Sequence, residues 1–230
     1  MPASGAVTRN TLRQQIADAL RDEVLAGRLL PGQEFTVKQI AEQYGVSATP
    51  VREALVDLSA QDLLDSDQHR GFRVHQFSVA DFRGMAEARA LIADAVFREL
   101  GDGHLAARAQ GTALVSVRRR AEEAARAAGA GDLNILIGYD LRFWRELCAL
   151  VANRYVAEFL HRLRVQAWVF SVPFLRAEGG AKACALWLWN GYEPLVDALT
   201  LGDAVAVRTV IGDYDAHSLK WADRLERPQK

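Results

Sequence analysis

The sequence contains little cysteine: Cys148 and Cys184 are the two cysteines among 230 residues. They lie far apart, in no CxxC pair and in no spacing that structural metal sites use. This pattern excludes a disulfide scaffold, and a reduced, cytoplasmic chain is the simplest interpretation.

The sequence also lacks a long apolar run. The longest candidate, Ala183–Trp189, is about one third of the roughly 18 residues that a membrane span requires. The N-terminal stretch MPASGAVTRN has no basic cluster followed by an apolar core, which a secretory signal would need. We therefore expect no membrane partner.

Neither sign of charge dominates. The chain carries 28 Lys and Arg against 29 Asp and Glu, and half of its residues are hydrophobic. This composition is typical of a globular protein, and the length accommodates two domains. Residues 1–75 carry eight Lys or Arg against ten Asp or Glu. If this part binds nucleic acid, it uses a few placed cations rather than a broad basic field.

Catalytic motifs are missing as well. The sequence shows no GxSxG, no HExxH and no P-loop, and no nucleophile–base pair or metal constellation is visible. We therefore expect that the protein is not an enzyme.

What the sequence does contain begins with three short helical patterns in residues 1–75. The first runs over about 8–26, Thr36 can cap the second, and Ser47 can cap the third. In the third helix, the buried stripe turns Thr49 and Arg52 outward together. Alternation around Phe72 then predicts a small hairpin. The combination predicts a winged helix-turn-helix, in which the start of the recognition helix enters the DNA major groove.

The stretch IADALRDEVLAGRLLPGQEFTVKQIAEQYGVSATPVREAL, continued by a hairpin ending RGFRV, resembles the N-terminal domain of GntR-family transcription regulators. The helical C-terminal half is similar to that of the FadR-type subgroup, which carries an FCD effector domain. The family often has Arg where this sequence has Ala48, which implies that one DNA contact is missing. The DNA-binding residues that the resemblance implies are Lys38, Ser47, Thr49, Arg52, Arg70 and Gly71.

Beyond residue 75 every pattern is helical. Ser78 and Asp81 form a capping-box pattern that opens a helix to about Leu100. Further helical segments are expected at about 103–128, 132–151, 154–170, 182–200 and 203–223, with Pro173 among the residues that separate them. The predicted fold is mainly α: a winged helix-turn-helix domain at 1–75, followed by an all-helical antiparallel bundle at 76–230 for effector binding and dimerisation.

The resemblance implies a metal site, which this sequence lacks. Many FCD domains hold a divalent metal with one Asp and three His. Asp140 matches the Asp, whereas Trp144, Tyr192 and Tyr214 stand at the three His positions. An indole nitrogen only donates hydrogen bonds, and a phenol with a pKa near 10 is a poor ligand at neutral pH. We therefore expect no metal and no other cofactor.

A pocket remains at that place, and the resemblance adds Arg89 and Asn153 to its lining. The expected effector-pocket residues are Arg89, Asp140, Trp144, Asn153, Tyr192 and Tyr214. They suit a small molecule that is anionic or polar, or a flat one that stacks on aromatic rings. Alternatively, the rings fill the space that the metal left. For Trp168, Trp187 and Trp189, a place in the core or in a dimer interface is favoured over a ligand cage.

The sequence thus predicts a sequence-specific DNA-binding transcription regulator, in this family usually a repressor. It is expected to bind pseudo-palindromic operator DNA as a homodimer, under the control of a small-molecule effector. One alternative is a constitutive DNA-binding protein whose pocket is filled by aromatic rings. Another follows the metal-free, fatty acyl-CoA-responsive branch of the subgroup.

Overall fold

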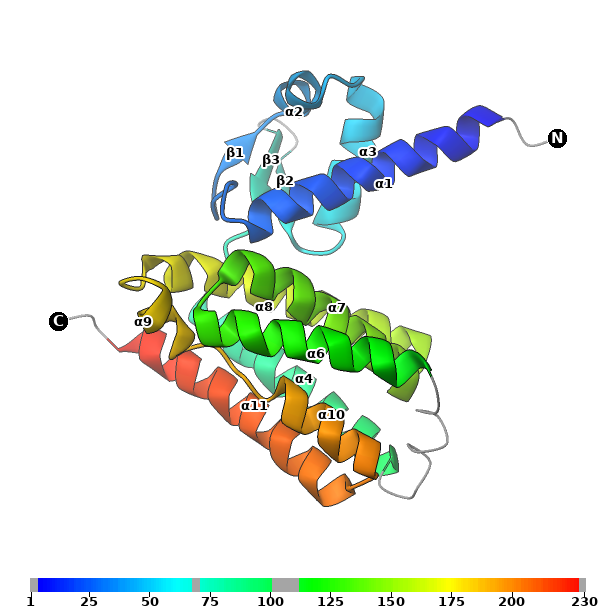
Figure 1. Ribbon diagram of the computed structural model, residues 1–230. Helices are drawn as coiled ribbons and strands as arrows, with labels where there is room; N and C mark the ends of the chain where they lie inside the picture. The colour runs from blue at the N-terminus through cyan, green and yellow to red at the C-terminus, as the bar shows by residue number, and fades with distance from the viewer. Residues whose placement is uncertain (1–3, 68–70, 101–111, 228–230) are drawn as a thin grey trace. The chain divides into compact units, whose positions relative to one another are not determined.

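The computed structural model describes residues 4–67, 71–100 and 112–227. Contacts within the chain divide it into two compact units, Met1–Phe77 and Ser78–Lys230 (Figure 1). No helix among the described residues is both long and apolar enough to cross a membrane.

The first unit combines three helices with a small antiparallel sheet. Its elements are α1 (Ser4–Leu25), β1 (Glu34–Phe35), α2 (Val37–Tyr44), α3 (Ala48–Ser59), β2 (Leu64–Asp67) and β3 (Gly71–Val74). The strands lie in the order β1-β3-β2. Leu20 of α1 packs with Val51, Leu55 and Leu58 of α3 in a core where each is at most 1% exposed. The predicted helix-turn-helix with a wing is confirmed.

Two local features explain this arrangement. Thr36 caps α2 as expected: its hydroxyl accepts from the Gln39 amide at 3.2 Å, while the Gln39 side chain accepts from the Thr36 amide at 2.7 Å. The strand β1 was not predicted, because two residues are too short to show an alternating pattern. Phe35 pairs with Phe72 of β3, so the hairpin becomes a three-stranded sheet.

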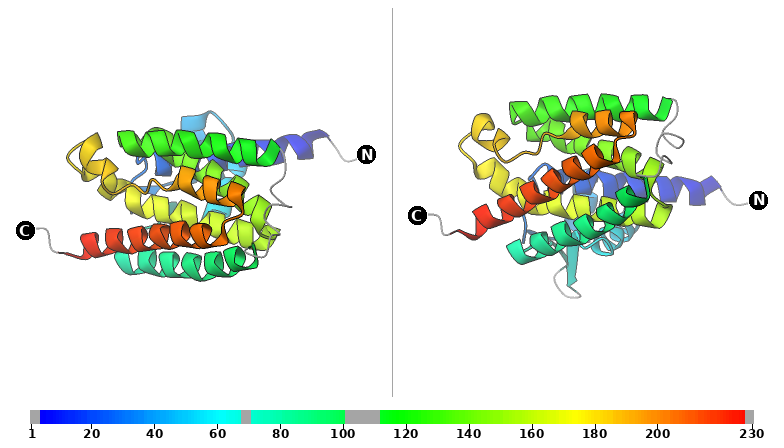
Figure 2. Two further views of the ribbon diagram at one scale, coloured as in Figure 1. Left: turned by 60° about the horizontal axis from the view of Figure 1, so that its bottom comes forward. Right: turned by 90° about the horizontal axis from the view of Figure 1, so that it is seen from below.

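The second unit is helical throughout its described residues. Its elements are α4 (Val79–Leu100), α6 (Thr112–Ala130), α7 (Leu133–Val151), α8 (Arg154–Ala177), α9 (Ala181–Ala185), α10 (Tyr192–Leu201) and α11 (Ala204–Glu226). Helices α4 and α11 lie side by side, as do α6 and α7, and α10 packs against α6 and α11 (Figure 2). The predicted helical C-terminal domain is confirmed.

Two predicted boundaries in this unit are wrong. Helix α8 does not end before Pro173 but continues to Ala177, because Val172 and Leu175 extend its buried stripe. The expected helix at 182–200 is two helices, α9 and α10, separated by residues 186–191. This irregular segment carries Trp187 and Trp189 into the unit, where they meet the rings of Trp221 and Tyr214.

Candidate functional site

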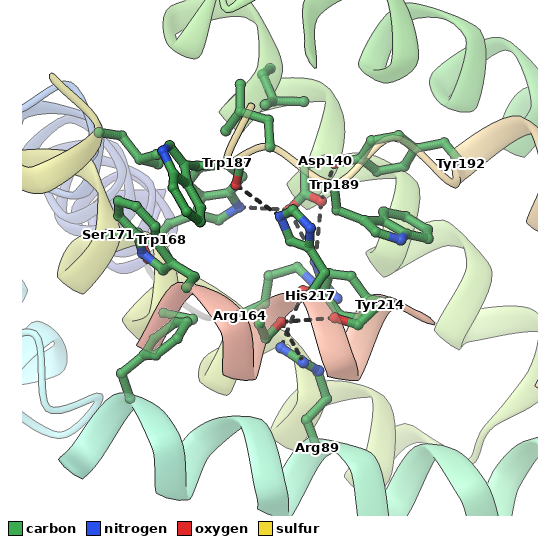
Figure 3. Close-up of a pocket in the computed structure, with 17 residues that line it drawn as sticks. Arg89, Asp140, Arg164, Trp168, Ser171, Trp187, Trp189, Tyr192, Tyr214 and His217 are labelled. Carbon is green, nitrogen blue, oxygen red and sulfur yellow. Dashed lines mark hydrogen bonds and ion pairs between the residues drawn. The ribbon is translucent and has the colours of Figure 1, made fainter. Parts of the chain in front are cut away.

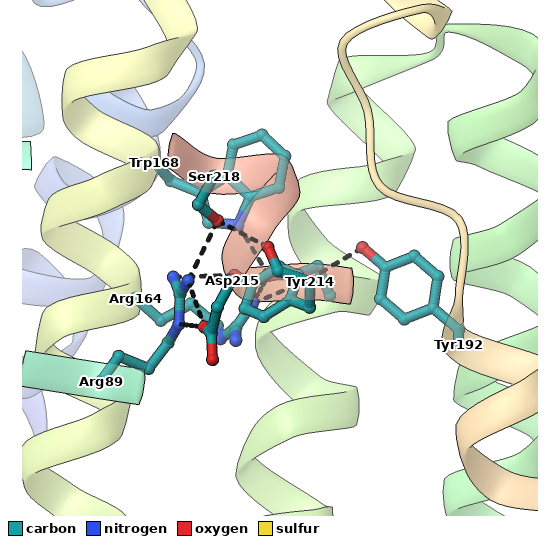
Figure 4. Close-up of polar contacts among 8 residues, drawn as sticks. Arg89, Arg164, Trp168, Tyr192, Tyr214, Asp215 and Ser218 are labelled. Atoms are coloured by element: carbon teal, nitrogen blue, oxygen red, sulfur yellow. Dashed lines mark hydrogen bonds and ion pairs between the residues drawn. The ribbon is translucent and has the colours of Figure 1, made fainter. Parts of the chain in front are cut away.

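The centre of the helical unit is the carboxylate of Asp140 on α7, which is 1% exposed. Three side chains donate to it: Arg164 through Nη1 at 3.1 Å to Oδ1, the Trp168 indole at 2.6 Å to Oδ2, and the Tyr192 hydroxyl at 2.9 Å to Oδ1 (Figure 4). Both carboxylate oxygens are therefore satisfied by protein donors, as a buried charge requires.

Arg164 of α8 is the cation that neutralises Asp140. Its guanidinium lies 4.2 Å from the ring centroid of Trp144 and 5.0 Å from that of Tyr214. Burial is the largest single influence and disfavours the charged form, but the carboxylate of Asp140 and smaller contributions from Tyr214, Tyr192 and Cys148 together outweigh it and raise the pKa of Arg164 above its usual value. Arg164 therefore stays charged inside the domain, between two aromatic rings that stabilise the cation.

A second buried ion pair joins α4 to α11. The Arg89 guanidinium donates to Asp215 Oδ1 at 2.9 Å and 3.2 Å, to the Ser218 hydroxyl at 3.0 Å and to the Tyr214 hydroxyl at 3.2 Å. It also lies 4.1 Å from the centroid of the Tyr214 ring. Tyr214 therefore stands between the two guanidinium groups of Arg89 and Arg164.

A cavity opens beside these pairs, and the centre of a water molecule can move through about 70 Å³ of it. That space has room for about five water molecules. Figure 3 shows the lining side chains gathered around it from α4, α7, α8, α11 and the segment 186–191. Its aromatic walls are Phe82, Trp168, Trp187, Trp189, Tyr192, Tyr214 and Trp221. A second, smaller space, with about 30 Å³ open to the centre of a water molecule, shares Arg89, Arg164 and Tyr214 with the first.

The structure brings most of the sequence-predicted pocket residues together. Arg89, Asp140, Tyr192 and Tyr214 line the first cavity, and Trp144 lines the second. The placement of Asn153 needs correction. Asn153 is exposed and is the N-cap of α8: its Oδ1 accepts a hydrogen bond from the Val156 amide at 3.0 Å. Its side chain is therefore not among those that line the two cavities.

Sequence reasoning missed the most important cation. Arg164 was not singled out, although an arginine one turn before Trp168, on a helix face with Leu163 and Val165 buried beside it, is an unusual residue to find inside a domain. Trp168, Trp187 and Trp189, for which a place in the core or in a dimer interface was favoured, all line the cavity.

The residues around Asp140 do not fit a metal ion. No group of three or more His, Cys, Asp and Glu side chains that could hold a metal occurs in the described parts of the chain. The hydroxyl of Tyr192 and the indole of Trp168 point hydrogens, not lone pairs, at the carboxylate. Burial and the charge of Asp140 raise the pKa of Tyr192 well above its usual value, which keeps the phenol protonated.

The other candidate site is the start of α3. Ser47, Thr49 and Arg52 are exposed, whereas Val51 and Leu55 on the opposite face are fully buried. Ser47 occupies the expected N-cap position, but its hydroxyl makes no capping bond to the helix. Among the described residues none bonds to the Arg52 side chain. The first-turn amides, a hydroxyl and a guanidinium are thus presented together at one helix end.

The remaining predicted DNA contacts have separate positions. Lys38 on α2 is 84% exposed, with its Nζ 3.8 Å from Glu42 Oε1, which is a weak surface pair. Gly71 begins β3 with φ 101°, and a Cβ there would lie 2.6 Å from the Phe35 carbonyl oxygen. The close approach of β3 to β1 therefore requires glycine at this position. Arg70 lies outside the described residues.

Comparison with known proteins identifies the family to which the chain belongs. The model for bacterial regulatory proteins of the gntR family matches residues 12–74, and the FCD domain model matches residues 85–214. The chain is 28% identical over 200 residues to the "Probable D-xylose utilization operon transcriptional repressor" of Paenarthrobacter nicotinovorans, covering 87% of this chain and 84% of that protein.

Two solved structures share the fold. E. coli McbR/YncC has a TM-score of 0.76 at 20% identity, over 94% of this chain and 99% of that chain. A GntR transcriptional regulator from Rhodococcus sp. RHA1 has a TM-score of 0.70 at 19% identity, again over 94% and 99%. Both structural units described above therefore occur together in solved proteins.

Proposed function

Because this chain belongs to the GntR family of bacterial regulatory proteins and carries an FCD domain, we propose that it is an effector-controlled repressor. The chain is a DNA-binding transcription regulator and not an enzyme. We infer in addition that a small molecule bound in the helical unit controls how tightly the protein binds operator DNA.

The observation that carries DNA recognition is the exposed first turn of α3. A recognition helix inserts its N-terminal end into the major groove, where an arginine can donate two hydrogen bonds to a guanine edge. Arg52 is exposed and uncommitted to described partners, and Ser47 keeps its hydroxyl free of the helix end. We assign base reading to Arg52 and phosphate contacts to Ser47, Thr49 and Lys38.

The observation that supports effector control is the cavity beside Asp140. Rings that merely filled the place of a lost metal would leave no space, whereas here seven aromatic side chains surround a cavity in which the centre of a water molecule can move through about 70 Å³. The printed name of the Paenarthrobacter relative describes a repressor of an operon for D-xylose use. That name supports repression, and it recommends sugars among the first compounds to test.

We further propose that no metal serves this site, since Arg164 already supplies the positive charge beside Asp140. A constitutive regulator without an effector is the alternative. It would require the cavity to close in solution, and no small molecule would then alter operator binding.

The test is a DNA-binding titration on an operator chosen by in vitro selection. Fluorescence anisotropy should show that Arg52→Ala loses about 1–3 kcal/mol on the selected site, because the guanine contact disappears. Arg52→Lys is the matched control: it keeps the charge but not the bidentate geometry, so only its non-specific binding should equal that of wild type. Equal affinity of wild type and Arg52→Ala for the selected site would refute the assignment.

A further inference from the structure

The two cations that reach the cavity are already neutralised by carboxylates. Arg164 pairs with Asp140 at 3.1 Å, and Arg89 pairs with Asp215 at 2.9 Å. All four side chains are largely withdrawn from water, with Asp215 the most exposed at 17%. Asp215 lies outside the lining of the first cavity and lines the second, and with it counted the charges of the two pairs sum to zero.

An anionic ligand would add an unpaired negative charge beside these two neutralised ion pairs. A third carboxylate near Asp140 would lose its hydration and find no unpaired cation among the described lining residues. The desolvation cost of a buried charge is recovered only by a partner of opposite charge with good geometry. Neutral molecules do not face this cost.

Among the polar groups of the lining are a donor and an acceptor that a ligand can use. Trp221 lines the cavity at 4% exposure, and its Nε1 has no hydrogen-bond partner in the described structure. His217 Nε2 lies 2.9 Å from the Trp187 carbonyl oxygen, which can only accept. Neutral His217 therefore carries its hydrogen on Nε2 and offers Nδ1 as an acceptor. A hydroxyl group is the simplest partner that can both accept from Trp221 and donate to His217.

The aromatic walls of the cavity favour a ligand that contains a ring. Trp187 and Trp221 lie with their centroids 5.4 Å apart, and Trp189 meets Tyr192 at 4.7 Å and Tyr214 at 4.8 Å. Such surfaces bury flat apolar faces, while the polar edge of the ligand meets the hydrogen-bonding groups.

We propose that the cavity binds an uncharged ring compound that carries hydroxyl groups, and that it discriminates against carboxylates. This inference rests on the proposed effector control. Two kinds of molecule share this chemistry, a neutral sugar and a hydroxylated aromatic ring.

The experiment compares matched neutral and acidic probes by thermal shift and calorimetry on the full-length protein. The neutral set contains aldopentoses, aldohexoses, phenol and catechol, and the acidic set contains the corresponding uronic acids, which keep the sugar ring, and hydroxybenzoates. At least one neutral compound should raise the melting temperature and release operator DNA, and it should bind at least tenfold tighter than its acid. The responding subset decides between a sugar and an aromatic ring.

A charge variant tests the reason for this preference. Asp215→Asn leaves Arg89 without its carboxylate, so the acids should bind this variant at least tenfold tighter than they bind wild type. Asp213→Asn is the matched control, because it makes the same change two residues away on α11 at an exposed position. It should leave both sets unchanged. Trp221→Phe keeps a ring but removes the donor, and should weaken the neutral ligand about three- to tenfold.

The outcomes separate the two proposals. If acids bind wild type as tightly as their neutral partners, this inference is overturned while effector control stands. If no compound of either set binds, both fall. Should Asp215→Asn fail to fold, which circular dichroism would show, the preference of wild type alone decides.

Discussion

At the residue scale, the interior of the helical unit is organised by Arg164. Removing one partner of a buried ion pair leaves the other charge uncompensated. Arg164→Met should therefore lower the free energy of unfolding by about 3–5 kcal/mol, measured by urea denaturation, because Asp140 would remain buried with only neutral donors.

The matched control for this prediction is Arg118→Met. Arg118 pairs with Asp197 at 2.8 Å, but the two side chains are 37% and 59% exposed. Solvent screening limits such a pair to about 1 kcal/mol or less. Comparable losses for the two variants would show that the Arg164–Asp140 pair is no more important than a surface contact.

The sequence predicted the carboxylate of this centre but not its cation. Asp140 could be found because it stands at a family position, and Tyr192 and Tyr214 because they stand where imidazoles are expected. Arg164 has no counterpart in that pattern. Only the packing of α8 against α7 shows that its charge is turned inward. Asn153 was misplaced although it directly precedes the segment expected at 154–170, where asparagine is a preferred N-cap residue.

At the element scale, the irregular segment 186–191 shapes the cavity wall. A Cβ on Gly191 would overlap Cζ2 of the Trp189 ring and lie 2.7 Å from its Cε2. Glycine at this position therefore leaves the space in which Trp189 sits against Tyr192 and Tyr214.

Gly191→Ala should displace the Trp189 ring, lower stability by about 1–3 kcal/mol and change the tryptophan fluorescence. Gly212→Ala on α11 is the control, since a Cβ there meets nothing within 4 Å. It should be neutral or stabilising by up to about 1 kcal/mol, as alanine favours a helix interior. An unchanged emission spectrum and stability in Gly191→Ala would refute this role.

Element boundaries were predictable where a cap was present and not elsewhere. Thr36 and the pair Ser78–Asp81 place the starts of α2 and α4, and the hydrogen bonds of both caps are formed. Residues 182–200 were expected to form one helix, although Asn190-Gly191, directly before α10, is a dipeptide that often marks a turn. The break follows from burial of Leu188 and the tryptophans beside it, which is a property of the tertiary structure.

At the scale of the whole molecule, we expect a homodimer on a pseudo-palindromic operator. A single winged domain reads too few base pairs for useful specificity, and a two-fold protein pairs with a two-fold site. Light scattering at micromolar concentration should give twice the mass of 25.4 kDa, with or without DNA. A monomer under both conditions would contradict the prediction.

The central claim about the molecule is that the Arg164 guanidinium, and not a metal ion, neutralises the buried Asp140 carboxylate of the effector domain. The most direct measurement is the melting temperature of protein purified without a His tag, before and after EDTA, with its metal content determined on the same sample. We predict an unchanged melting temperature and no stoichiometric transition metal, because Arg164, Trp168 and Tyr192 already satisfy Asp140. A near-stoichiometric metal, or a marked loss of stability on chelation, would contradict the claim.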